Sequence, residues 1–174
     1  MRQQSSGLSD GSSQSHFEFS RRILILRVAI IARMRIKPLV LCLLLSLPLL
    51  AEKKVIQPKD FPTGRPFSPG ILADGTLYIA GQTGADLKTG KIADNFEAEV
   101  KQCLDNIGLI LKEAGMGFGD AVAVQVYLTD MELFPRMNAV YTTYFKEPRP
   151  ARTTVGVAKL VGVAKIEITV TARK

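Results

Sequence analysis

A valine-rich run from Ala121 to Leu128 constrains the fold of this chain more than any other segment. Apart from Gln125 the run is apolar or aromatic, at odd and even positions alike. This pattern predicts a central strand covered on both faces. Stretches with helical periodicity flank the run on both sides, at about 95–114 and 131–145. We therefore expect a sheet with helices packed against it.

The first of these helices should run from about Asn95 to Ala114, because its apolar residues recur at steps of three and four. Asp94 is the expected N-cap, with Glu97 in the capping-box position, and Gly115 suits the position after the last turn. Cys103 lies on the apolar stripe, so we interpret it as a core residue rather than a reactive thiol.

The remaining elements complete a predicted order of two strands, helix, strand, helix and two strands. A strand at 77–80 follows the turn Asp74-Gly75, a helix capped by Asp130 covers 131–145, and two strands follow at 153–158 and 166–171. The expected fold is an α/β (α+β) sandwich, in which a mixed sheet carries two helices on one face. Since two helices cover only one face, we expect the other face to pack against copies of the chain.

The N-terminal part of the chain has a different composition. Residues 1–33 are predicted to be disordered or an over-long extension, with Met34 as the true initiator. Residues 34–51 combine a short basic opening, an apolar run and a small boundary residue, Ala51, which is typical of a signal peptide. We therefore predict a periplasmic or secreted protein cut near Ala51. A cytoplasmic or membrane-anchored protein is the alternative, although arginines within 21–50 would be costly in lipid; no stable membrane anchor is expected.

Residues 52–174 are predicted to form one domain with little net charge. The whole chain carries +7, but 16 basic and 14 acidic residues remain after position 51, a net +2. This gives no support for a nucleic-acid partner. The only histidine is His16, and Cys103 is the only cysteine of the domain, so neither a metal site nor an internal disulfide is expected. Chemistry is left to arginine, carboxylate, amide and hydroxyl groups.

Arg152 and Glu167 are the most conspicuous candidates for that chemistry. Arg152 lies in Pro150–Val155, and Glu167 follows fifteen residues later between two isoleucines. A guanidinium can hold a carboxylate through two parallel hydrogen bonds, and a glutamate can orient or deprotonate water. From the pattern alone we favour the plainer interpretations, a salt bridge at a subunit junction for Arg152 and an exposed strand residue for Glu167.

Six segments together resemble the RidA family, the YjgF-like reactive-intermediate imine deaminases. They are Arg65-Pro66-Phe67-Ser68, Gly81-Gln82, Val126–Met131, Met137–Tyr141, Pro150–Val155 and Lys165–Ile168. The similarity extends over residues 55–172. It implies a homotrimer of chorismate-mutase-like subunits with clefts between neighbours. In the family's deaminases these clefts hydrolyse 2-aminoacrylate and related enamines or imines to 2-keto acids and ammonia, without a cofactor.

The resemblance also assigns roles to residues. The family's carboxylate-binding arginine matches Arg152, and its water-associated glutamate matches Glu167. Gly81 and Asn138 match a glycine and an asparagine of the site, and the main chain near Gly81 and Ala151 is expected to orient the substrate.

The chain departs from the family pattern at two positions. Many deaminases have a tyrosine where this chain has Phe67, which we still expect to contact substrate, and often a serine where it has Ala80. Three hypotheses follow: an enamine/imine deaminase, a non-catalytic trimer that binds small carboxylates, and, more weakly, an endoribonuclease or translation inhibitor.

Overall fold

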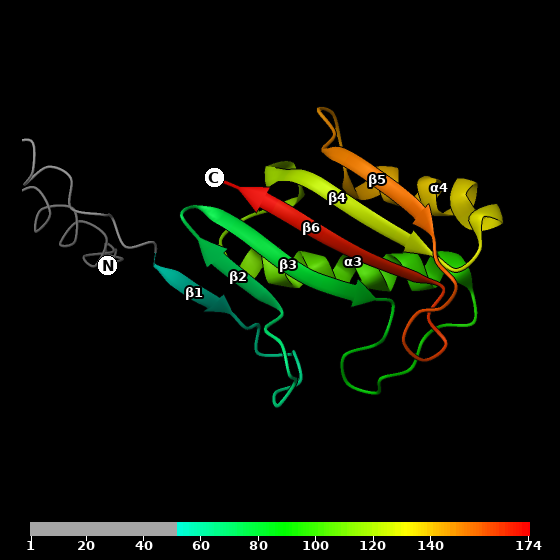
Figure 1. Cartoon of the computed structure of the whole chain (residues 1–174), viewed down its shortest axis with the longest axis horizontal. Helices are drawn as coiled ribbons and strands as arrows, with labels where there is room; N and C mark the ends of the chain where they lie inside the picture. Colours follow the sequence, from blue (N-terminus) through cyan, green and yellow to red (C-terminus); the bar gives the residue numbers. More distant parts are fainter. Residues whose placement is uncertain (1–51) are drawn as a thin grey trace, which may run out of the picture. The chain divides into compact units, whose positions relative to one another are not determined.

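The computed structural model describes residues 52–174 (Figure 1). The predicted N-terminal extension and signal peptide, residues 1–51, lie outside the described residues. Between residues 52 and 174, no helix has the length and apolar character needed to cross a membrane.

Six strands form one mixed sheet in the order β1-β2-β3-β6-β4-β5. Only β4 and β5 run parallel; every other neighbouring pair is antiparallel. The strands are β1 (Lys53–Ile56), β2 (Gly70–Ala73), β3 (Thr76–Thr83), β4 (Ala121–Leu128), β5 (Ala151–Gly156) and β6 (Ile166–Arg173). The predicted mixed sheet is confirmed, with the valine-rich run as an inner strand.

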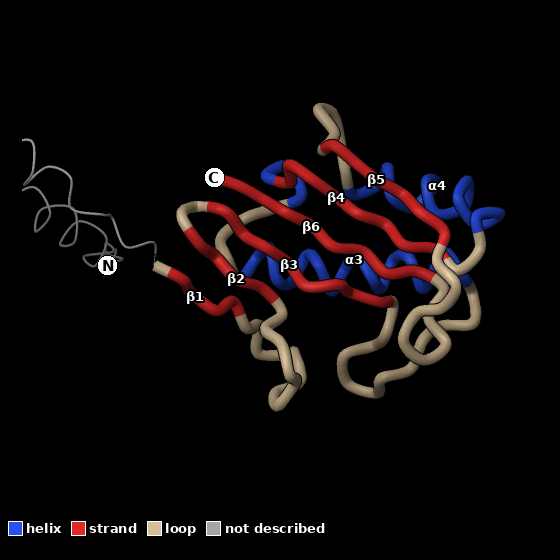
Figure 2. The backbone as a smooth tube through the Cα atoms, in the orientation of Figure 1, coloured by secondary structure: helices blue, strands red, loops and turns tan. Residues whose placement is uncertain are grey.

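Two helices, α3 (Phe96–Glu113) and α4 (Phe134–Tyr144), lie on one face of this sheet, behind it in the view of Figure 2. Two short 3-10 turns, η1 (Phe118–Asp120) and η2 (Met131–Leu133), precede β4 and α4. The predicted two-layer sandwich with both helices on one face is therefore confirmed.

The predicted cap of the first helix is displaced by one residue. Asn95, not Asp94, has the extended N-cap backbone, and its side chain accepts a hydrogen bond from the Ala98 N–H at 2.9 Å. Both residue types cap well, so sequence alone did not separate them. At the other end Gly115 has φ of +70°, as predicted.

Three other elements differ from the sequence prediction. β1 was missed, because its basic residues disguise an edge strand whose only buried side chain is Ile56. β3 does not close at Ala80 but continues to Thr83 across a bulge. The second helix starts with η2, where Asp130 accepts from the Glu132 N–H at 2.9 Å.

The core lies between the helices and the sheet. Cys103 is fully buried there, as predicted, and its Sγ donates to the Gln82 carbonyl oxygen at 3.0 Å. Burial strongly raises the pKa of this thiol, and the nearby Glu99 carboxylate raises it further, so it stays protonated.

The opposite face of the sheet is open in the single chain. Along β4, Val124, Val126 and Leu128 are buried, whereas Ala123 and Gln125 alternate with them on the other side and are exposed. Within one chain this strand is therefore covered on the helix side only. The expected cover of the other face by copies of the chain stays a prediction.

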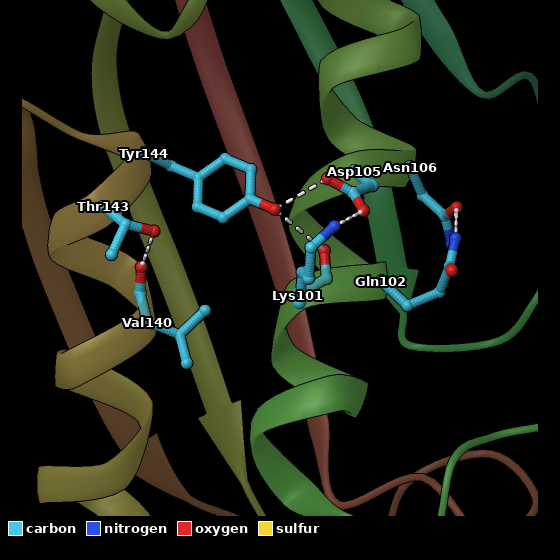
Figure 3. A network of polar contacts seen from close by, with 7 residues as sticks. All are labelled: Lys101, Gln102, Asp105, Asn106, Val140, Thr143 and Tyr144. Atoms are coloured by element: carbon cyan, nitrogen blue, oxygen red, sulfur yellow. Dashed lines mark hydrogen bonds and ion pairs between the residues drawn. The ribbon is translucent and has the colours of Figure 1, made fainter.

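Polar contacts fix the two helices to each other (Figure 3). The Tyr144 hydroxyl of α4 donates to Asp105 of α3 at 2.6 Å, and Lys101 forms an ion pair with the same carboxylate at 2.7 Å. Burial raises the pKa of Tyr144, and the hydrogen bond to Asp105 raises it further. These contacts set the position of α4, which packs beside β5.

Candidate functional site

A hollow of about 510 Å³ lies beside β3 and β6, at the end of β3 where the bulge interrupts pairing. Its walls include Phe67, Ala80, Gly81 and Glu167, all singled out from the sequence. This volume is in the range of pockets that bind small molecules.

Glu167 and Gly81 meet at the floor of the hollow. Ile166 and Ile168 are buried on the helix side of β6, so Glu167 between them points to the open face of the sheet. A Cβ atom added to Gly81 would overlap Oε1 of the Glu167 carboxylate. Residue 81 therefore has to be glycine for Glu167 to lie where it does.

Hydrogen bonds to α3 hold the end of β3. Asn106 is buried, and its Nδ2 donates to the carbonyl oxygens of Thr83 at 3.2 Å and Ala85 at 2.9 Å. Gln82, also buried, donates to the Ala80 carbonyl oxygen at 2.9 Å. Gln82 was quoted from the sequence only as part of the Gly81-Gln82 segment, and Asn106 was not singled out, although an asparagine one step from the apolar stripe of a helix is a usable signal.

Glu99 supports the other strand of the floor and was also missed. Its side chain is fully buried, and Oε1 accepts hydrogen bonds from the N–H groups of Lys165 at 2.7 Å and Ile166 at 3.3 Å. Oε2 is buried without a hydrogen-bond partner in residues 52–174. The bonds fix the start of β6 immediately before Glu167.

Phe67 lies at the mouth of the hollow with 48% of its surface exposed. The guanidinium carbon of Arg65 is 5.7 Å from the centroid of its ring, a cation–π contact. Arg65 lines the same hollow and was quoted from the sequence only as part of a motif.

Arg152 is in a different place. It pairs in register with Val124, whose side chain is buried, so it leaves β5 on the helix side of the sheet. Its guanidinium carbon lies 4.5 Å from the ring centroid of Tyr141 and 5.6 Å from that of Phe134. Burial raises the pKa of the Tyr141 hydroxyl, and the positive charge of Arg152 partly offsets that rise.

The predicted residues therefore fall into two groups within one chain. Gly81, Phe67 and Glu167 share the hollow, whereas Arg152, Asn138 and Ala151 belong to α4 and β5 and do not line it. In the described part of the chain, no cluster of three or more His, Cys, Asp or Glu residues could hold a metal ion.

Comparisons with known proteins show which family the chain resembles. Residues 58–174 match the Endoribonuclease L-PSP family. A RutC family protein of Aquifex aeolicus is 40% identical over 115 residues, which cover 65% of this chain and 91% of that protein. The 2-iminobutanoate/2-iminopropanoate deaminase of Mus musculus is 39% identical over 118 residues, covering 67% and 87%.

The similarity extends to the three-dimensional fold of a solved structure. The YjgF gene product of E. coli has 33% sequence identity and a TM-score of 0.66, and the match covers 70% of this chain and 98% of that one. The family match, the relatives and the fold lead to one conclusion: the chain belongs to the Endoribonuclease L-PSP family, and within it to the RidA (YjgF-like) proteins.

Proposed function

We propose that this protein hydrolyses reactive 2-enamine and 2-imino acids of the 2-aminoacrylate type to 2-keto acids and ammonia, without a cofactor. One observation carries the proposal: the Glu167 carboxylate lies against Gly81 in a hollow large enough for a small imino acid. Similarity to the mouse 2-iminobutanoate/2-iminopropanoate deaminase supports this reaction class.

The site we propose is completed by a second copy of the chain in a homotrimer. Arg152 and Glu167 leave the sheet on opposite faces, so one chain does not bring them together. The open face of the sheet exposes Tyr78 and Val155, apolar surface of the kind that subunit contacts cover. We propose that a neighbour covers this face and that its edge strand β5 lies beside the hollow.

The chemistry follows from these groups. Arg152 of one subunit binds the substrate carboxylate and fixes the plane of the adjacent iminium carbon. Glu167 of the other orients a water molecule and takes its proton as the oxygen adds to that carbon. Glu167 then passes this proton to the nitrogen of the tetrahedral carbinolamine and takes up the hydroxyl proton, so the C–O double bond forms as the C–N bond breaks and ammonia leaves. An enamine first gains a proton at its terminal carbon to reach the same iminium.

A coupled assay tests the activity. An amino-acid oxidase generates fresh imino acid, and release of the keto acid is followed with wild type, Arg152→Ala and the control Arg173→Ala. Arg173 is an exposed arginine at the far end of β6. We expect acceleration by wild type and by the control, and none by Arg152→Ala. Hydrolysis at the rate of the protein-free solution in all three samples contradicts the proposal.

The alternative is a trimer that binds small carboxylates without turning them over. Phe67 and Ala80 favour it, because neither supplies a hydroxyl to the hollow. Calorimetric binding of a keto acid that needs Arg152, together with no acceleration of imine hydrolysis, would establish this alternative.

We also propose that the protein is exported and cut near Ala51. The motivation is the basic opening and apolar run at positions 34–51. Mass spectrometry of the protein isolated from its own cells gives the N-terminus. A mature chain that still contains Met34 contradicts this proposal.

A further inference from the structure

We propose that Arg65 makes the hollow selective for 2-imino acids with a second carboxylate at the end of the side chain. This inference rests on the proposed deaminase function and names its substrate class. Arg65 would bind the distal carboxylate, while Arg152 of the neighbouring subunit binds the carboxylate next to the imine.

The position of Arg65 is the first argument. Arg65 and Glu167 are the two charged residues that line the hollow. The lining of the hollow therefore contains one cation, Arg65, and one anion, Glu167. A substrate with an iminium near Glu167 and a carboxylate near Arg65 matches both charges.

The availability of Arg65 is the second argument. The three salt bridges between residues of the 52–174 domain involve Lys101, Arg136 and Arg149, but not Arg65. Its guanidinium carbon instead lies 5.7 Å from the centroid of the Phe67 ring, a cation–π contact that uses none of its N–H groups as hydrogen-bond donors. Edge N–H groups are those that bind a carboxylate in two parallel hydrogen bonds.

The rest of the lining does not compete for that role. Gln82 and Asn106 are buried and donate to main-chain carbonyl oxygens. Leu87 and Val161 present apolar surface, which suits the methylene groups between two charged ends.

The size of the hollow is the third argument. At about 510 Å³ it exceeds what a three-carbon imino acid occupies, and Arg65 also lines an adjoining hollow of about 370 Å³. Four- or five-carbon dicarboxylic imino acids use this extra length, whereas short neutral ones leave Arg65 without a partner.

The test compares two substrate classes in Arg65→Gln and in the control Arg173→Gln. An oxidase acting on glutamate supplies the acidic imine, and an oxidase acting on alanine or methionine supplies neutral ones. We expect kcat/KM for the acidic imine to fall at least about tenfold in Arg65→Gln, the order expected when a charge-assisted contact is lost. The neutral imines and the Arg173→Gln protein should stay within about twofold of wild type. Arg65→Lys should retain part of the preference.

Three results overturn the inference. Equal losses on both classes show that Arg65 binds the carboxylate common to all substrates. No loss on either class shows that Arg65 is a surface residue. If wild type turns over neutral imines but not the acidic imine, the proposed substrate class is wrong and the proposed deaminase function still stands.

Binding separates this inference from the deaminase function. If wild type accelerates no imine, calorimetry with 2-oxoglutarate and pyruvate still tests Arg65. Tighter binding of the dicarboxylate that disappears in Arg65→Gln upholds the inference for a binding protein. Equal or absent binding of the two keto acids contradicts it.

Discussion

The hollow at β3 and β6 and the edge strand β5 hold their charged residues in different ways. Glu167 lies on the open face of the sheet, against a glycine, in a floor tied down by Glu99 and Asn106. Arg152 lies on the helix side, stacked on the rings of Tyr141 and Phe134. The hollow is a concave surface that can receive a ligand. Arg152 on β5 is a cation at the edge of the sheet, and aromatic rings hold it in position. One chain thus carries the two halves of the proposed site in places where they do not meet.

The sharpest test of this division mixes two inactive proteins. Arg152→Ala and Glu167→Gln subunits are unfolded together in equal amounts and refolded. If each site takes its arginine from one subunit and its glutamate from the next, random mixing restores about one quarter of the sites. We expect about a quarter of wild-type activity from two samples that have almost none separately.

The control is to mix the same proteins without unfolding them, so that subunits do not exchange. This sample should stay inactive. A site built within one chain predicts no activity in either mixture, because every chain then carries one defective residue. Sedimentation of the refolded mixture checks that trimers formed.

Gly81→Ala tests the glutamate side alone. The added methyl overlaps the Glu167 carboxylate, which is the far end of a flexible side chain, so the carboxylate should move while the fold survives. We expect kcat to fall about tenfold to a hundredfold, as misplacement of a catalytic group does. The melting temperature should change little. Gly119→Ala is the matched control, because a Cβ there meets no atom within 4 Å. Full activity in Gly81→Ala would show that Glu167 need not lie against residue 81.

Sequence patterns predicted the fold better than the site, because the fold depends on residues close together in the sequence and the site depends on contacts between residues far apart in it. Apolar spacing determines which face of a helix or strand is buried, so Cys103 and the alternating strand β6 were placed correctly. Glu99 and Asn106 act through hydrogen bonds to main-chain groups 66 and 23 residues away, and no local pattern encodes such pairings. The sequence did not decide on which face of the sheet Arg152 lies for a related reason: the face of β5 depends on its register with β4.

Glu99→Ala tests how far the floor of the hollow depends on a buried carboxylate. The substitution leaves the N–H groups of Lys165 and Ile166 without their acceptor at the start of β6. We expect a loss of about 1–3 kcal/mol in the free energy of unfolding, measured with urea, and a drop in kcat from a less fixed Glu167. Glu99→Gln keeps an acceptor oxygen and should retain most of both. Unchanged stability in Glu99→Ala would remove Glu99 as the support of β6.

Tyr141→Phe tests the arginine side and should have the smallest effect. The hydroxyl is buried without a hydrogen-bond partner in residues 52–174, whereas the ring that Arg152 stacks on is kept by phenylalanine. We expect activity close to wild type and a change of less than about 1 kcal/mol in the free energy of unfolding at neutral pH. Tyr144→Phe is the comparison, and it should cost more because that hydroxyl donates to Asp105.

The pH dependence gives Tyr141→Phe a second readout. Because the folded pKa of Tyr141 is raised, the unfolded chain releases this proton first. The contribution of Tyr141 to the free energy of unfolding is therefore fully present below the ordinary tyrosine pKa of 10.0, and it falls as the pH rises above that value. The variant should lose less stability over that interval, as followed by urea unfolding at increasing pH. If Tyr141→Phe instead abolishes activity at neutral pH, the Tyr141 hydroxyl orients Arg152. The ring contacts alone would then not be enough to position the guanidinium.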